Sequence, residues 1–339
     1  MIEIALATCD SERFLPALLD SLFAQTRQDF TILVSDDASR DGTPAVLDSY
    51  ARRFPGRIRQ LPSNAVRLGV IANFDRLLAH ATGDYLFLCD HDDVWLPHKM
   101  ERSLAAMRAL AAEHAPGTPL LVHSDLVVVG PALEVIHPSF FAYAGIDPRR
   151  NDFLRLLLAN VVTGCTSVMN RALYRHARPI PREAMMYDHW IALVAAMSGA
   201  IAYVDEPLIL YRQHEANAIG ARPPRAASFA QRVHGTLVSR EREWLLKRYS
   251  AQAAALIARF GAEMAPRDRL AAKTLADLWE TPRLRRFARL RRCGLGLEGL
   301  VRTIALWIVV TRGTRPAGRR APSAAMVGPE GFEPPTKPL

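Results

Sequence analysis

The sequence predicts an α/β fold with a mostly parallel sheet flanked by helices, followed by a helical C-terminal extension. Two patterns support this class. In the first third of the chain, short apolar runs alternate with stretches whose apolar residues recur at helical spacing. After Gly220 the composition shifts towards Ala, Arg and Leu, and the pattern looks helical. Strands that alternate with helices favour parallel pairing, because each crossover helix returns the chain to the same end of the sheet.

The strands are expected where a short apolar run ends at polar residues. Residues 2–7 open the chain in this way, and residues 85–89 run directly into an acidic segment. The expected strands cover residues 2–7, 30–34, 58–61, 85–89, 120–129 and 166–170, with two short strands within 201–211.

The helices are expected where apolar residues return every three or four positions. Phe14, Leu18 and Leu22 mark one face of the first helix. Pro97 indicates the start of another, because proline is favoured in the first turn. The expected helices cover residues 11–25, 43–54, 70–81, 97 onward, 152–159 and 187–199.

Polar side chains follow three of these strands. Thr8 ends the first, Asp36 and Asp37 end the second, and residues 90–93 end the fourth. Ligands of open α/β sheets bind beyond the carboxyl ends of the strands. The sequence therefore predicts one site that is built from three separate segments.

The run Asp90-His91-Asp92-Asp93 places three carboxylates within four residues. Carboxylates this close repel one another, and burial adds to the cost. A divalent cation removes that penalty, and hard oxygen ligands suit Mg²⁺ or Mn²⁺. An acidic turn without a metal is the alternative interpretation.

The second acidic segment has two interpretations that hold together. Asp36 and Asp37 can accept hydrogen bonds from the hydroxyl or N–H groups of a nucleoside. Asp41, Gly42 and Thr43 form a turn and a cap for the helix that follows.

Several ordered motifs together carry a family resemblance that none carries alone. They are residues 7–10 (ATCD), 34–43 (VSDDASRDGT), 67–74 (RLGVIANF), 90–95 (DHDDVW), 163–166 (TGCT), 187–190 (YDHW) and 211–214 (YRQH). With these motifs the chain resembles the family 2 glycosyltransferases of the GT-A fold, most closely their bacterial rhamnosyltransferase-like branch. The resemblance covers about residues 1–220, which we expect to form the GT-A domain.

The resemblance implies an inverting transfer from a nucleotide-diphospho-sugar, with Mn²⁺ or Mg²⁺ as cofactor. Thr8 and Asp37 would contact the nucleoside. Asp90 and Asp92 would form the D-x-D pair that serves both donor and metal. Asp92 would be the direct metal ligand, with Asp93 in support.

The resemblance also assigns the downstream residues. Asp188 matches the family's catalytic base, which deprotonates the acceptor hydroxyl. An N-cap for the helix that follows is the alternative role of Asp188. His214 would bind the metal or the diphosphate, and Arg212 would pair with phosphate. A structural loop that closes on the site is the alternative for both.

One position departs from the family pattern. The family commonly has Thr-Tyr-Asn where this chain has Thr8, Cys9 and Asp10. The tyrosine often stacks on the nucleobase, and a cysteine cannot do so. The identity of the nucleotide therefore stays open.

The net charge of +9 favours anionic partners. Residues 221–311 are expected to form a helical, basic region, and the apolar run 300–310 within it is too short to span a bilayer. A monotopic membrane anchor and a packed helix both fit this run. Residues 312–339 are expected to be a disordered tail, and residues 331–334 suggest read-through into a tRNA gene.

Cysteine spacing and the N-terminal sequence bear on the compartment. Four scattered cysteines and an N-terminus without a signal peptide predict a cytoplasmic protein. A peripheral position at the inner face of the cell membrane stays open.

The function that these observations favour is sugar transfer to a saccharide or lipid-linked acceptor in cell-surface polysaccharide synthesis. A nucleotidyltransferase is the alternative enzyme, although residues 8–12 lack the Gly-rich phosphate loop that it needs. A non-catalytic membrane-associated protein of the same fold is the third interpretation. We expect no nucleic-acid partner, because no such motif accompanies the C-terminal arginines.

Overall fold

The computed structural model describes residues 1–215, 240–296 and 300–312. The segment 312–339, expected to be a disordered tail, lies outside these residues except for Arg312. Residues 216–239, which contain the expected domain boundary at residue 220, also lie outside the described residues. The described residues fall into two compact units. The first unit comprises Met1–Asn151, Val161–Ile180 and, among the described residues, 187–215. The second unit comprises Asp152–Asn160, Pro181–Met186 and the C-terminal helices.

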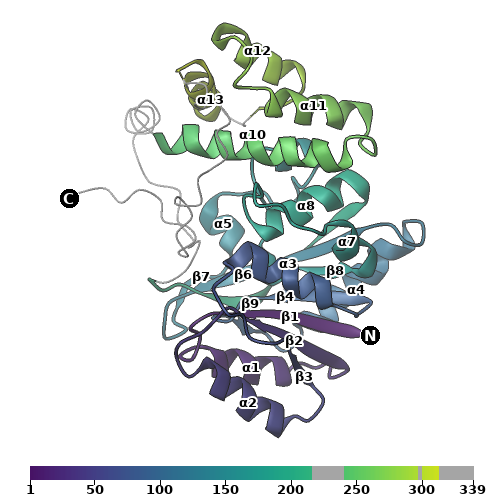
Figure 1. The fold of residues 1–339 in the computed structure, drawn as a ribbon, viewed down its shortest axis with the longest axis vertical. Coiled ribbons are helices and arrows are strands. Elements are labelled where there is room, and N and C mark those ends of the chain that lie inside the picture. Colours follow the sequence, from purple (N-terminus) through teal and green to yellow (C-terminus); the bar gives the residue numbers. More distant parts are fainter. Residues whose placement is uncertain (216–239, 297–299, 313–339) are drawn as a thin grey trace, which may run out of the picture. The chain divides into compact units, whose positions relative to one another are not determined.

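The first unit has the α/β architecture that the sequence predicts, and a mixed sheet forms its centre (Figure 1). Its strands follow the order β3-β2-β1-β4-β8-β6-β9-β5, with β7 paired to β6. The first four strands are parallel, as the alternation of strands and helices indicates. They are β1 (Ile2–Thr8), β2 (Phe30–Asp36), β3 (Ile58–Gln60) and β4 (Tyr85–Cys89).

The other strands extend the sheet by antiparallel joins, apart from the parallel pair β6–β9. They are β5 (Val94–Trp95), β6 (Leu120–Val129), β7 (Val135–His137), β8 (Val168–Asn170) and β9 (Ala200–Arg212). The expectation of two short strands within 201–211 is wrong, because β9 is continuous. Its register against β6 shifts between Ser124 and Asp125, which accommodates the exposed residues Asp205 and Glu206.

Helices cover both faces of the first four strands. Helices α1 and α2 lie on one face, and α3 lies on the other with α7 and α8 beside it (Figure 1). The chain order explains this placement, because the crossover from β3 back to β4 runs in the opposite direction along the sheet. The helices are α1 (Leu15–Phe23), α2 (Thr43–Arg53), α3 (Val70–His80), α4 (Lys99–Ala112), α5 (Phe140–Ala144), α7 (Arg171–His176) and α8 (Tyr187–Ser198).

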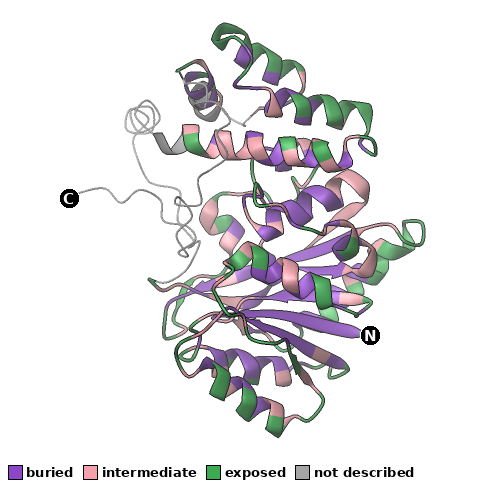
Figure 2. Cartoon of the chain, viewed as in Figure 1, coloured by how far each residue is buried: buried purple, intermediate pink, exposed green. Residues whose placement is uncertain are grey.

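The core of the first unit lies between these helices and the sheet. Strand β1 is buried along its whole length (Figure 2). Leu15, Leu18 and Leu22 on the inner face of α1 belong to the same buried core. Burial at i, i+3 and i+7 is the helical periodicity that the sequence shows. The polar residues at the strand ends therefore adjoin a well-packed hydrophobic core.

The second unit is helical. It contains α6 (Phe153–Leu156), α10 (Arg240–Phe260), α11 (Pro266–Ala276), α12 (Arg283–Arg292) and α13 (Leu300–Arg312). Among the described residues, no helix is long and apolar enough to cross a membrane. Among the apolar residues of α13 whose side chains the structure describes, Leu306, Ile308, Val309 and Val310 are buried in the unit, whereas Trp307 is 51% exposed.

Candidate active site

The carboxyl ends of β1, β2 and β4 meet at one edge of the sheet. The register pairs Thr8 with Asp36 and Leu6 with Cys89, so Asp90 follows beside the end of β1. Three segments that lie far apart in the sequence are therefore adjacent here. This convergence is the one that the alternating strands and helices predict.

Thr8 and Asp36 are tied to each other. The Thr8 hydroxyl donates to Asp36 Oδ1 over 2.8 Å, and Ser39 donates to the same carboxylate from its hydroxyl and its backbone N–H. Asp36 is buried, so these bonds satisfy oxygens that water does not reach. Its main role in this arrangement is to hold the loop after β2.

Asp37 anchors a second loop. Its carboxylate accepts hydrogen bonds from the backbone N–H groups of Leu68 and Gly69, at 2.7 Å and 2.9 Å, and from the side chain of Asn64. Gly69 has a φ of 81°, a conformation that side chains disfavour, which explains a glycine at this point. The loop before α3 therefore closes on the end of β2 through Asp37.

Cys9 lies between these two loops and beside a charged pair. Asp10 forms an ion pair with Arg67, and its backbone has a left-handed φ of 47°. Burial raises the pKa of the Cys9 thiol to about 11, despite the opposing charge of Arg67. The thiol is therefore neutral near pH 7, and Arg67 is a cation close to the position where the family commonly has a tyrosine.

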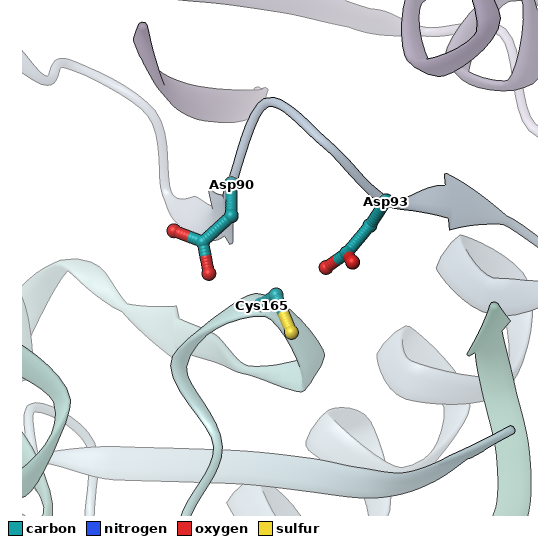
Figure 3. Close-up of side chains that lie close together, drawn as sticks. All are labelled: Asp90, Asp93 and Cys165. Atoms are coloured by element: carbon teal, nitrogen blue, oxygen red, sulfur yellow. The ribbon is translucent and has the colours of Figure 1, made fainter. Parts of the chain in front are cut away.

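Asp90 and Asp93 point from the loop between β4 and β5 towards Cys165, which lies in the 3-10 turn η1 (Gly164–Thr166) (Figure 3). One ligand atom of each of these three residues lies within 4.8 Å of the others. Burial, and then the charge of Asp92, raise the pKa of Asp90 to about 7. Burial, followed by the charges of Asp92 and Asp90, raises the pKa of Asp93 well above its usual range.

This cluster suits a divalent cation. Asp93 is fully buried, and among the described residues its Oδ2 atom has no hydrogen-bond donor. A buried carboxylate oxygen without a partner is costly, and a cation would satisfy it. Two carboxylates favour Mg²⁺ or Mn²⁺ over softer ions, whereas burial raises the pKa of the Cys165 thiol and disfavours the thiolate that a soft ion prefers.

Asp92 points to a different partner from its two neighbours. Its Oδ2 atom lies 2.9 Å from His214 Nε2, and the imidazole stacks on Phe14 with ring centroids 4.7 Å apart. Burial alone would raise the pKa of Asp92, but the hydrogen bond to His214 and the nearby imidazole charges lower it. The predicted metal ligands are thus divided between two adjoining groups.

Arg212 links the acidic run to strand β9. Its backbone N–H donates to Asp93 Oδ1 over 3.2 Å, and its guanidinium donates to the backbone oxygens of Asp92 and Pro131. Only 4% of the residue is exposed. In this conformation Arg212 holds the acidic loop in place rather than projecting into solvent.

Asp188 lies in the first turn of α8, and both its oxygens accept backbone hydrogen bonds. Gly164 donates to Oδ2 over 3.0 Å and His189 donates to Oδ1 over 2.6 Å. The neighbouring Tyr187 donates from its hydroxyl to Asp90 Oδ1 over 3.1 Å. Residues 187 and 188 thus connect α8 to η1 and to the acidic run.

The sequence did not single out three residues that complete this arrangement. Tyr187, Gly164 and Cys165 stand inside recognised motifs, but only the fold shows that they contact Asp90, Asp93 and Asp188. Gly164 and Cys165 lie in the motif at residues 163–166 and Tyr187 in the motif at 187–190, and these positions could have marked them as site residues.

A fourth residue, Lys99, is fully buried behind the acidic run, 4.1 Å from the ring centroid of Trp95. Burial lowers the pKa of Lys99 to about 8, and the negative charge of Asp93 opposes this effect. The polar neighbours of Lys99 in the sequence, His98 and Glu101, give no signal of this burial.

Comparison with known proteins identifies the family of this chain. The model of the glycosyl transferase family 2 matches residues 3–177. An uncharacterized protein of Mycobacterium tuberculosis is 29% identical over 208 residues, which cover 60% of this chain and 56% of that protein. A dTDP-rhamnosyl transferase of Shigella flexneri is 24% identical over 227 residues, covering 64% of this chain and 74% of that protein. The chain therefore spans little more than half of the mycobacterial relative.

Solved structures show the same fold. Residues 1–349 of Staphylococcus aureus TarS, crystallised with UDP-GlcNAc, superpose with a TM-score of 0.53 at 15% identity. The match covers 91% of this chain and 90% of the TarS fragment. The same fragment with UDP gives a TM-score of 0.51. The family model also argues against the nucleotidyltransferase interpretation.

Proposed function

Because this chain belongs to the glycosyl transferase family 2, we propose that it transfers a sugar, with inversion, from a nucleotide-diphospho-sugar to a saccharide or lipid-linked acceptor. The observation that carries the proposal is the convergence of Asp90, Asp93 and Asp188 at the carboxyl edge of the sheet. Two buried carboxylates suit a cation, and a third carboxylate lies close enough to raise the pKa of Asp90. A cation and a base side by side are what a transfer from a diphosphate leaving group needs.

The donor's nucleoside would bind over the ends of β1 and β2. Thr8, Asp36 and Asp37 offer oxygen atoms there, and the Asp37 carboxylate already accepts three hydrogen bonds from the loop before α3. The rhamnosyl donor of the Shigella flexneri relative is the first donor to test, with UDP-GlcNAc as the second.

The metal would be Mn²⁺ or Mg²⁺ held by Asp90 and Asp93. Asp92 belongs to the same loop and would support the metal site beside them. When bound, the metal would offset the negative charge that develops on the departing diphosphate. Asp92 and His214 hold one side of the loop, and Arg212 holds the other. The acidic run would therefore be preorganised before the donor arrives.

Asp188 would be the base. Its two backbone hydrogen bonds fix the carboxylate at the start of α8, where it can take the proton of the acceptor hydroxyl. The freed oxygen then attacks the anomeric carbon from the side opposite the diphosphate, which inverts the configuration. Asp188 is the second residue of α8, inside the first turn and not at the N-cap, and its negative charge there also suits the helix dipole.

The test is an Asp188→Asn variant assayed with dTDP-rhamnose and UDP-GlcNAc in the presence of Mn²⁺. We expect the variant to bind the donor in calorimetry while sugar transfer to water or to a test acceptor falls by about 10² to 10⁴. The matched control is Asp268→Asn, which removes an acid from the first turn of α11 in the helical unit. Unchanged transfer in Asp188→Asn would refute the base, and loss of donor binding would make Asp188 structural.

A further inference from the structure

Helix α12 is the most basic element in the described part of the chain. Its sequence is RLRRFARLRR, and it contains no acidic residue. Arg286 is buried, whereas the other arginines are exposed. The exposed set is Arg283, Arg285, Arg289, Arg291 and Arg292.

The positive charge of this set is not neutralised within the unit. None of the exposed arginines forms an ion pair with a residue that the structure describes. Asp277, six positions before α12, is paired with Lys273. Like charges crowded on one helix repel one another, so an anion bound from outside would lower the free energy of this surface.

The faces of α12 are sharply divided. Arg286 and Leu290 point into the unit and are 3% and 0% exposed. On the opposite face, Leu284 is 91% exposed, and Arg291, two helical turns further on, lies on the same side of the helix. Arg283 and Arg285 lie on either side of Leu284. An exposed leucine among arginines offers an outside partner an apolar contact beside the positive charge.

The buried Arg286 fixes this orientation. Its guanidinium donates to the backbone oxygens of Thr281, Trp279 and Val310, and it lies 5.0 Å from the ring centroid of Trp279. Val310 belongs to the last turn of α13, where carbonyl groups lack helical partners. Arg286 thus ties α12 to α13 and leaves the opposite face outward.

We propose that this outward face of α12 binds an anionic lipid surface, with its arginines at the headgroups and Leu284 inserted between them. The proposal moves the main membrane contact from the apolar run 300–310 to α12. Of the apolar side chains that the structure describes in that run, Leu306, Ile308, Val309 and Val310 are buried in the unit, whereas Trp307 is 51% exposed. A helix with cationic flanks around an apolar centre is the type that lies in a membrane interface.

A lipid surface fits the face better than nucleic acid does. Nucleic acid would use the arginines for phosphate contacts but would leave Leu284 in water. Lipid headgroups supply the same negative charge and also an apolar layer beneath it. The exposed Leu284 therefore favours a lipid surface over nucleic acid.

The test measures partition of the full chain into vesicles of phosphatidylcholine with about 30% phosphatidylglycerol, compared with pure phosphatidylcholine. We expect binding to the anionic vesicles alone, and weaker binding at high salt. The variant Arg285→Gln/Arg292→Gln should bind about 30-fold more weakly, because each arginine near an anionic surface contributes about 1 kcal/mol. Leu284→Ala should weaken binding at all salt concentrations, since its contribution is apolar.

The matched control is Arg52→Gln/Arg108→Gln, which removes two exposed arginines from α2 and α4. It should bind the vesicles like the parent chain. Melting temperatures of all variants show whether the helical unit stays folded. Equal partition of the α12 variant and the control would overturn the proposal. Displacement from vesicles by an RNA oligonucleotide at equal phosphate concentration would assign the face to nucleic acid instead.

Discussion

The Tyr187 hydroxyl donates a hydrogen bond of 3.1 Å to the carboxylate of Asp90, across 97 positions in the sequence. The tyrosine ring is held by stacking on Phe74 of α3, with centroids 3.6 Å apart. Tyr187 is also the residue that precedes the proposed base Asp188. One side chain therefore fixes the distance between the acidic run and the start of α8.

The first prediction is that Tyr187→Phe weakens Mn²⁺ binding roughly 10- to 100-fold. The hydrogen bond stabilises the charged form of Asp90, and a bond of this kind contributes roughly 1.5–3 kcal/mol. Calorimetric titration of Mn²⁺ into the variant measures the effect. The matched control is Tyr143→Phe, which removes a hydroxyl from a partly exposed tyrosine of α5. An unchanged dissociation constant would show that Asp90 does not rely on Tyr187.

The second prediction concerns Gly164. A Cβ atom at this position would lie 2.3 Å from the Tyr187 hydroxyl oxygen. Gly164→Ala must therefore push Tyr187 away from Asp90, and we expect a loss of about 1–3 kcal/mol in stability together with weaker Mn²⁺ binding. Gly296→Ala is the control, since the nearest atom to its added Cβ is 3.5 Å away. In a double-mutant cycle with Tyr187→Phe the two effects should couple, and strict additivity would contradict the contact.

The fold was predictable wherever burial is continuous along an element. Residues 85–89 and 120–129 are strands with the expected bounds, because residues 85–89 form a continuous apolar run and residues 120–129 carry apolar runs on both sides of a short polar segment. Strand β9 misled the prediction, since Asp205, Glu206 and Pro207 resemble a break. A register shift against β6 lets these exposed residues bulge without ending the strand. Local sequence does not reveal such a shift, because the partner strand determines it.

The site was predictable in its members but not in their pairing. The acidic run places Asp90, Asp92 and Asp93 together by sequence alone. The structure divides them, with Asp92 against His214 and the other two carboxylates against Cys165. That division depends on where β9 and η1 return to the sheet edge. Contacts of this kind arise from tertiary packing, which periodicity does not encode.

The third prediction addresses the two roles that the sequence leaves open for His214. We expect that His214 positions Asp92, because its Nε2 atom lies 2.9 Å from the carboxylate and its ring stacks on Phe14. His214→Ala should weaken Mn²⁺ binding 10- to 100-fold, the usual effect of losing such a supporting hydrogen bond. His214→Gln keeps a donor and should retain most of the affinity. Equal losses in both variants would instead indicate that the imidazole itself binds the metal.

The last prediction concerns His123 on β6, which is fully buried between Phe141 and Tyr203. Among the described residues neither ring nitrogen has a hydrogen-bond partner. Burial lowers the pKa of His123 to about 3, whereas an unfolded histidine titrates near pH 6.5. Below that pH the unfolded chain takes up a proton that the folded chain excludes. The stability is therefore fully present above about pH 6.5 and is lost progressively as the pH falls towards 3.

His123→Phe removes this proton uptake and two buried polar atoms without partners. The variant should be more stable than the parent chain, and the difference should grow by up to about 1.4 kcal/mol per pH unit below pH 6. Urea unfolding at a series of pH values measures both effects. His114→Phe is the control, because His114 is exposed and its replacement should leave the pH dependence unchanged. Parallel stability curves for the parent chain and His123→Phe would mean that His123 is protonated in the folded state, which would require an acidic or water partner inside the sheet.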